Sequence, residues 1–141
     1  MFFFGSYEHS IDAKGRVSLP STFRKEFGEG APLVLVPGSN GEVNVFSQKG
    51  FSEWLELIFE PDGGFKRTNR DHVRRRMHYS NAAKQVEVDK AGRISIPPAL
   101  IECGGFDKTI MVCGDVDHVS LWDPARRDEF MGDYAPDEIY G

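Results

Sequence analysis

The feature that most restricts the fold of this chain is an internal repeat. Residues 11–20 (IDAKGRVSLP) match residues 88–97 (VDKAGRISIP) at a spacing of 77. The Asp, Gly, Arg, Ser and Pro of the segment are identical in both copies, and every apolar position stays apolar. Later apolar runs also correspond, 33–36 with 110–113 and 43–46 with 119–122. Both halves therefore encode the same ordered elements, and a fold built from two related halves is expected.

Each repeat begins with a pattern typical of a strand, a tight turn and a second strand. Apolar and polar residues alternate on both sides of the Asp-x-x-Gly-Arg sequence, which predicts a hairpin. Gly15 and Gly92 can adopt the positive φ that a short turn requires, and Asp12 and Asp89 can accept hydrogen bonds from its backbone N–H groups. We therefore expect these four residues to form and orient the turns.

Helices are expected around these strands. Pro20 and Pro97 end the second strand of each repeat, and the short helical segments that follow are stopped by glycine. Asp123 followed by proline predicts a helix over 125–131. The residues past Gly132 are expected to fray.

The segment between the repeats predicts two longer helices. Apolar residues recur at helical spacing in Phe51, Trp54, Leu55, Ile58 and Phe59. This spacing predicts one buried helix face, with Ser47 as the N-cap. The sequence 68–71 resembles a capping box that opens a second helix, in which Val73 and Met77 face inward and the arginines face outward.

Charge is segregated along the chain. The net charge of −5 argues against an indiscriminate nucleic-acid binder, which is usually basic. Residues 66–84 nevertheless contain seven basic side chains and one acidic side chain, whereas residues 102–141 contain ten acidic and three basic ones. This asymmetry suits either an anionic partner at the basic segment or head-to-tail contacts between copies of the chain.

The sequence carries no motif for catalysis, metal binding or cofactor binding. It has no GxSxG, P-loop or GxGxxG pattern, and its four histidines lack metal-ligand spacing such as HExxH. Cys103 and Cys113 form no CxxC pair, and we expect them to be reduced and buried in a cytoplasmic protein. No apolar run approaches the length of a membrane span. We therefore expect no enzymatic activity, cofactor, metal, small-molecule substrate or membrane partner.

These motifs resemble the bacterial MraZ regulators of the AbrB-like swapped-hairpin superfamily. The resemblance is carried by the duplicated Asp-x-x-Gly-Arg segment, by the opening sequence FFGSYEHSID over 3–12, and by the basic helix between the halves. It covers almost the whole chain and implies an α+β, mainly β fold: a tandem-duplicated swapped-hairpin or double-split β-barrel with short flanking helices. The implied units are a first half with its amphipathic helix at 1–60, a linker and basic helix at 61–82, and a second half with a helix and flexible tail at 83–141.

The same resemblance implies a sequence-specific DNA-binding transcription regulator, usually a repressor. Members of the family bind short direct repeats of double-stranded DNA upstream of the operon for division and cell-wall synthesis, and they form closed homo-oligomeric rings. A cytoplasmic, nucleoid-associated protein that regulates its own operon is therefore expected. Two alternatives stay open: an antitoxin-like interaction module on the same barrel, and a hydrolase that uses Asp12 and Asp89 as a carboxylate pair.

Arg16, Lys14, Arg93 and Lys90 are the expected DNA-contacting residues. On a two-stranded ribbon in the major groove, an arginine can form bidentate bonds to guanine O6 and N7, and a lysine can meet phosphate. The alternative for each arginine is a salt bridge to the aspartate of its own turn that only stabilises the hairpin. The lysine directly precedes glycine in the first turn but comes one residue earlier in the second, so the halves need not contact DNA equivalently.

Three arginines of the basic helix form a possible secondary surface, namely Arg70, Arg74 and Arg75. Charge runs are usually solvated helix faces, and direct DNA contact, a subunit interface and long-range attraction of DNA are all compatible with this one.

Overall fold

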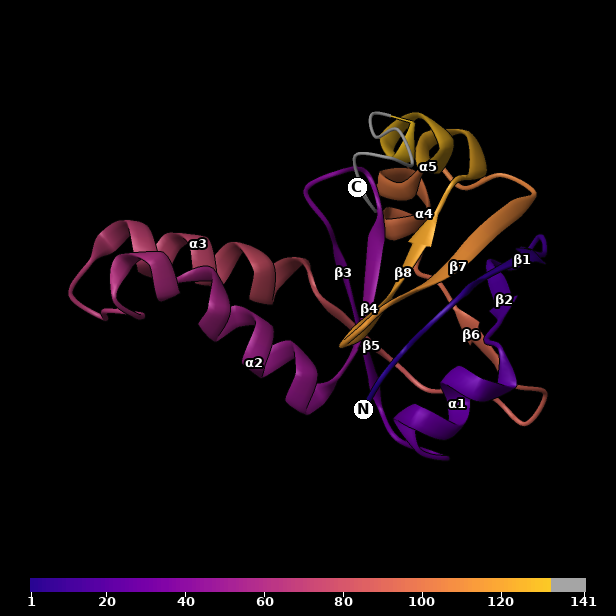
Figure 1. Cartoon of the computed structure of the whole chain (residues 1–141), viewed down its shortest axis with the longest axis horizontal. Coiled ribbons are helices and arrows are strands. Elements are labelled where there is room, and N and C mark those ends of the chain that lie inside the picture. Colours follow the sequence, from indigo (N-terminus) through magenta and orange to yellow (C-terminus); the bar gives the residue numbers. More distant parts are fainter. Residues whose placement is uncertain (133–141) are drawn as a thin grey trace, which may run out of the picture.

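The centre of the structure is an antiparallel sheet to which both repeats contribute strands. The computed structural model describes residues 1–132. Its strands are β1 (Ser6–Ser10), β2 (Arg16–Ser18), β3 (Leu33–Pro37), β4 (Val43–Ser47), β5 (Lys84–Val86), β6 (Arg93–Ser95), β7 (Thr109–Asp115) and β8 (His118–Trp122). Six of them form one sheet in the order β1-β7-β8-β4-β3-β5, and β2 pairs with β6 in a separate two-stranded ribbon (Figure 1). The predicted α+β class is confirmed.

The strands of the two repeats are interleaved. β1 of the first repeat pairs with β7 of the second, so that Ser6 lies opposite Cys113. β5 of the second repeat pairs with β3 of the first, so that Val86 lies opposite Leu33. The predicted turns are present, but the strands on either side of the first turn share only the bridge between Ile11 and Val17. The predicted hairpin between neighbouring strands is therefore wrong, because the strands on either side of each turn pair mainly with strands of the other half.

The core lies between the large sheet and the β2–β6 ribbon. Val17 and Ile94 lie opposite each other at the centre of the ribbon, and both are fully buried. They pack in one cluster with sheet residues such as Leu35 and Val112. β1 and β5 remain outer strands of the sheet, so the barrel is not closed.

Three short helices cover the ends of the sheet. α1 (Ser21–Phe27) and α4 (Pro98–Gly104) directly follow Pro20 and Pro97, as predicted. α5 (Pro124–Met131) begins after Asp123, whose carboxylate accepts a hydrogen bond from the backbone N–H of Arg126 at 3.1 Å. The expected fraying past Gly132 concerns residues that lie outside those described.

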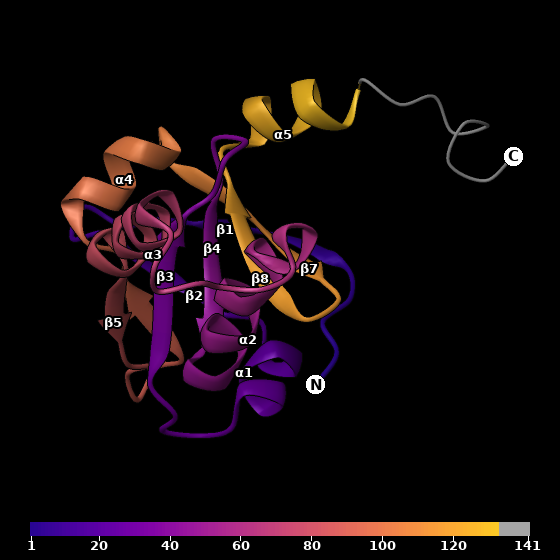
Figure 2. The same cartoon turned by 90° about the vertical axis from the view of Figure 1, so that its left-hand side faces the viewer.

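The helices α2 (Gln48–Ile58) and α3 (Arg70–Ala82) form an arm that projects from the sheet on the side away from the β2–β6 ribbon (Figures 1 and 2). The short 3₁₀ helix η1 (Glu60–Asp62) lies at its tip. Ser47 is the N-cap of α2, as predicted, and its hydroxyl accepts from Gly50 N at 3.0 Å. None of the helices in residues 1–132 has the length and apolar character needed to cross a membrane.

The burial of the arm differs from the prediction. The predicted face of α2 is the less exposed one, since its residues Phe51, Trp54, Leu55 and Ile58 are partly buried. None of them is fully buried, because the helix stands off the sheet, and Phe59 just beyond its end is enclosed. Asn69 caps α3 alone, its side-chain oxygen accepting from the N–H groups of Asp71 and His72, so the predicted capping box is wrong. Met77 is 55% exposed rather than inward-facing.

Two arginines of the arm pack inward instead. The guanidinium of Arg76 lies 3.7 Å from the centre of the Phe65 ring, and that of Arg75 lies 5.2 Å from the centre of Phe59. Cation–π attraction and the apolar stems of arginine therefore supply part of the contact that Met77 was expected to make.

Candidate nucleic-acid interface

The two turns have the same hydrogen-bond pattern. In the first, one carboxylate oxygen of Asp12 accepts from the backbone N–H groups of Lys14 and Arg16, both at 2.9 Å. In the second, Asp89 accepts from the equivalent N–H groups of Ala91 and Arg93, also at 2.9 Å. Each aspartate thus supplies the acceptor that holds its turn closed. The repeated sequence therefore produces the same local geometry twice.

Each turn also joins its arginine to its aspartate. Arg16 Nε donates to Asp12 Oδ2 at 2.7 Å, and Arg93 Nε donates to Asp89 Oδ2 at 3.1 Å. The backbone N–H of Arg16 lowers the pKa of the Asp12 carboxyl, with a further contribution from the guanidinium, and the N–H of Arg93 does the same for Asp89. Both aspartates therefore stay ionised and can orient the guanidinium groups.

The salt bridge in each turn uses only one nitrogen of the guanidinium group. Only Nε of Arg16 and of Arg93 is bonded, and their terminal nitrogens have no hydrogen-bond partner within residues 1–132. Their side chains are 31% and 34% exposed. An arginine fixed at Nε presents its two terminal N–H₂ groups in a defined direction, which is the arrangement that bidentate recognition requires.

The pairing of β2 with β6 places the two arginines on one surface. Arg16 lies opposite Ser95, and Arg93 lies opposite Ser18, with the buried pair Val17 and Ile94 between them. Because successive side chains of a strand point to opposite faces, both arginines and both serines lie on the outer face of the ribbon. The arginines are diagonal neighbours, and the Cα atoms of such neighbours in antiparallel strands are about 7–8 Å apart. We call this surface the ribbon face.

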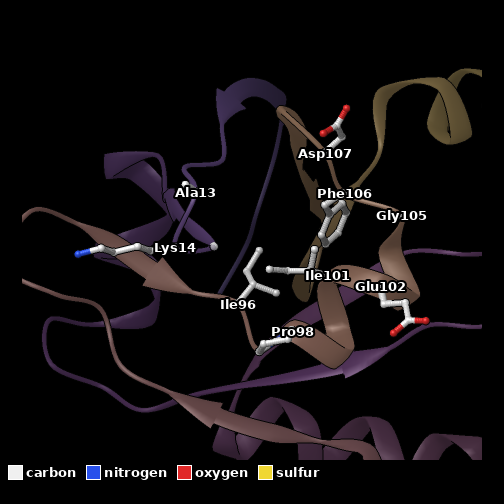
Figure 3. A pocket seen from close by; sticks show the side chains of 10 residues that line it. Ala13, Lys14, Ile96, Pro98, Ile101, Glu102, Gly105, Phe106 and Asp107 are labelled. Carbon is white, nitrogen blue, oxygen red and sulfur yellow. The ribbon is translucent and has the colours of Figure 1, made fainter.

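The turns that carry the lysines lie at opposite ends of the ribbon, because each turn precedes one of two antiparallel strands. Lys14 and Lys90 are both exposed. In Figure 3 the side chain of Lys14 extends away from an apolar depression formed by Ile96, Ile101 and Phe106. The lysines therefore flank the ribbon face at its two ends.

The secondary basic surface is separate from the ribbon face. Arg70 and Arg74 are exposed on α3, which lies on the opposite side of the sheet (Figure 1). Arg75 is partly neutralised, since it lies 3.8 Å from Asp62 and 3.9 Å from Asp71. The exposed arginines of α3 therefore do not extend the ribbon face.

Sequence reasoning missed Ser18 and Ser95, which complete the ribbon face. Strict alternation around the buried apolar residue of each second strand could have identified them. Both cysteines were expected to be buried, and the structure confirms this only for Cys113. Cys113 is buried, and its burial raises the pKa of its thiol, whereas Cys103 is exposed because it lies on the outer side of α4. Residues 1–132 contain no group of His, Cys, Asp and Glu side chains that could hold a metal ion.

The sequence matches one protein family and several of its named members. The family model described as "MraZ protein, putative antitoxin-like" matches residues 2–67 and 80–133. The protein named "Transcriptional regulator MraZ" of Acetivibrio thermocellus is 38% identical over 133 residues, which cover 93% of this chain and 87% of that protein. The proteins of the same name from Leifsonia xyli subsp. xyli and Treponema denticola are 37% identical over 129 residues and 30% identical over 133 residues. These two matches cover 92% and 94% of this chain, and 86% and 90% of the respective relatives.

The matched residues include both repeats, both turns and every strand of the sheet and ribbon. The interval left out, 68–79, contains most of α3 and its exposed arginines. The family model therefore covers all of the interleaved β-structure, and the match to this model, together with the three relatives, shows that the chain belongs to the MraZ family.

Proposed function

We propose that this protein is a transcription regulator that reads double-stranded DNA with the ribbon face. The observation that carries the proposal is the placement of Arg16 and Arg93, one from each repeat, on the same outer surface, each held at Nε by an aspartate. A two-stranded ribbon fits the width of the major groove. The relatives named above are transcriptional regulators by name, which supports a DNA partner for this chain.

Each side chain has a separate role in the proposed contact. Arg16 and Arg93 direct their terminal nitrogens to guanine O6 and N7 and so read sequence, whereas Lys14 and Lys90 neutralise phosphates and so set position. Asp12 and Asp89 are positioning residues. They do not face the DNA backbone, because a carboxylate near phosphate is repelled, and their oxygens are already occupied by the turn.

The finer proposal is that the protein acts as a ring-forming homo-oligomer on short direct repeats upstream of its own gene, as a repressor of an operon for division and cell-wall synthesis at the nucleoid. One ribbon face is small and the chain carries a net charge of −5, so a single copy binds weakly. Copies held in one assembly raise the effective concentration of each further ribbon once the first is docked. Head-to-tail copies present the ribbon in one sense, which suits direct rather than inverted repeats.

The test compares selective DNA retention by Arg16→Ala, Arg93→Ala and the control Lys49→Ala, which removes one charge from an 88% exposed side chain on α2. Each lost bidentate contact removes about 1–3 kcal/mol of base discrimination. We expect Arg16→Ala to abolish selective binding and Arg93→Ala to weaken it. Variants that are folded and still select the upstream DNA as wild type does would refute the proposal. Co-purification of a toxin-like protein without DNA retention would favour the antitoxin-like alternative.

A further inference from the structure

The interleaved fold gives the two turns different neighbours. The first turn packs against α4, and a methyl group placed on Gly15 would lie 2.8 Å from Ile101 Cδ1. The second turn packs against α1, and a methyl group placed on Gly92 would coincide with the guanidinium of Arg24. Arg24 and Ile101 are equivalent positions of the repeat, 77 residues apart. One turn is therefore backed by an alkyl side chain and the other by a cation.

The next position along each helix increases this difference. Lys25 of α1 is exposed and corresponds to the exposed Glu102 of α4. The depression beside the first turn also includes Asp107. The two turns thus share their internal hydrogen bonds, while α1 beside the second turn carries Arg24 and Lys25 at the positions where α4 beside the first turn carries Ile101 and Glu102.

The Arg24 side chain is available for an external ligand. It is partly exposed and lines a shallow depression together with Lys90 of the second turn, and the lining of this depression also includes Glu29 and Asp89. No carboxylate in the described part of the chain lies within ion-pair distance of its guanidinium, in contrast to those of Arg16 and Arg93. Among residues 1–132, its five N–H donors form no hydrogen bond, so no contact inside the described part of the protein uses them.

We propose that Arg24 binds a DNA phosphate and makes the second turn the principal backbone anchor of the ribbon face. The proposal rests on the proposed DNA-binding function. Gly92, at φ 80°, leaves the space in which the guanidinium lies against the turn, and Lys90 supplies a second cation for a neighbouring phosphate. At the first turn, Glu102 and Asp107 oppose phosphate, so Lys14 acts there without a helix-borne partner.

A contact to phosphate and a contact to a base have different experimental signatures. Losing a phosphate contact weakens binding to all sequences by the same factor and reduces the slope of log affinity against log salt by about 0.9. Losing a base contact reduces the discrimination between sequences instead. A merely structural role of Arg24, exerted through Arg93, would therefore lower discrimination.

The experiment measures the affinity of the full chain for two duplexes of equal length, the region upstream of its own gene and a scrambled version, from about 50 to 200 mM salt. Arg24→Met is compared with Lys49→Met, which removes an equal charge from α2. We expect Arg24→Met to weaken binding to both duplexes by the same factor. The ratio of wild-type to variant affinity should fall about threefold between the lowest and the highest salt concentration. Arg24→Lys should restore most of the slope.

Glu102→Lys gives the reciprocal test at an exposed position that is expected to tolerate substitution. It should strengthen binding to both duplexes and steepen the salt slope, because it makes the surroundings of the first turn resemble those of the second. The role of Arg24 would be overturned if Arg24→Met and Lys49→Met gave the same slope of log affinity against log salt. It would also be overturned if Arg24→Met lost affinity only for the upstream duplex. A wild-type protein that binds neither duplex would overturn the proposed function itself, together with this inference.

Discussion

Replacing Ile94 by alanine should destabilise the whole molecule, because this side chain lies where the two repeats interlock. Ile94 is fully buried opposite Val17 at the centre of the ribbon. The substitution removes three carbons, worth about 0.8 kcal/mol each in transfer free energy. The remaining cavity adds to this loss, so the expected destabilisation is about 3–4 kcal/mol. That is a large part of the 5–15 kcal/mol of a typical domain and corresponds to a fall in Tm of about 10 °C.

The assay is urea unfolding followed by two probes. In a Trp54→Phe background, fluorescence of Trp122 reports on β8, and far-UV circular dichroism reports mainly on the helices. We expect both probes to give one coincident transition, shifted to lower urea by Ile94→Ala and, to a smaller extent, by Val17→Ala from the other repeat. The control Ser95→Ala, exposed on the same strand, should change the free energy of unfolding by less than about 0.5 kcal/mol. A loss below about 1 kcal/mol, or a shift in only one probe, would refute the interlocked core.

Three further predictions concern the turns and the cysteines. Gly15→Ala should cost more stability than Gly30→Ala in chemical denaturation, because both glycines have positive φ but only Gly15 has close neighbours; equal losses would contradict the packing of Ile101 and Ile96 on the turn. Because the pKa of Asp12 is lowered from its ordinary 3.8, its ionised form stabilises the turn above that value, and the contribution disappears as the pH falls through the folded-state pKa. Hydrogen exchange of the Lys14 and Arg16 amides should therefore accelerate below that pH, and this acceleration should be absent in Asp12→Asn. A thiol reagent should modify Cys103 in the native protein and Cys113 only after unfolding, with labelling followed by mass spectrometry; rapid native labelling of Cys113 would show that it is not buried.

Much of the local structure could be predicted from the sequence because the interactions that determine it are short-range. The Asp-x-x-Gly-Arg turn closes through hydrogen bonds that span two to four residues, and the helices after Pro20 and Pro97 depend on adjacent prolines and glycines. The apolar runs 33–36 and 119–122 became buried strands as their composition indicated. The duplication then implied that each local feature occurs twice.

The arm shows where periodicity alone was insufficient. Helical spacing predicted that α2 and α3 form, but not how far each face would be covered. Burial depends on what lies opposite, and these helices stand off the sheet. Met77 therefore remains exposed, while Arg75 and Arg76 lie over phenylalanine rings that come from the connection between the helices.

The sequence by itself determined the two turns, their aspartate–arginine pairs and the family to which the chain belongs, because a repeated local pattern is visible without knowledge of the fold. Only the tertiary structure decided which strands pair. It brought Arg16 and Arg93 onto one surface through the β2–β6 ribbon, and it placed Arg24 against Gly92, 68 residues away in the chain. Pairing of distant strands depends on the burial of Val17 and Ile94 in a common core, and no short-range pattern specifies which distant strand completes that core.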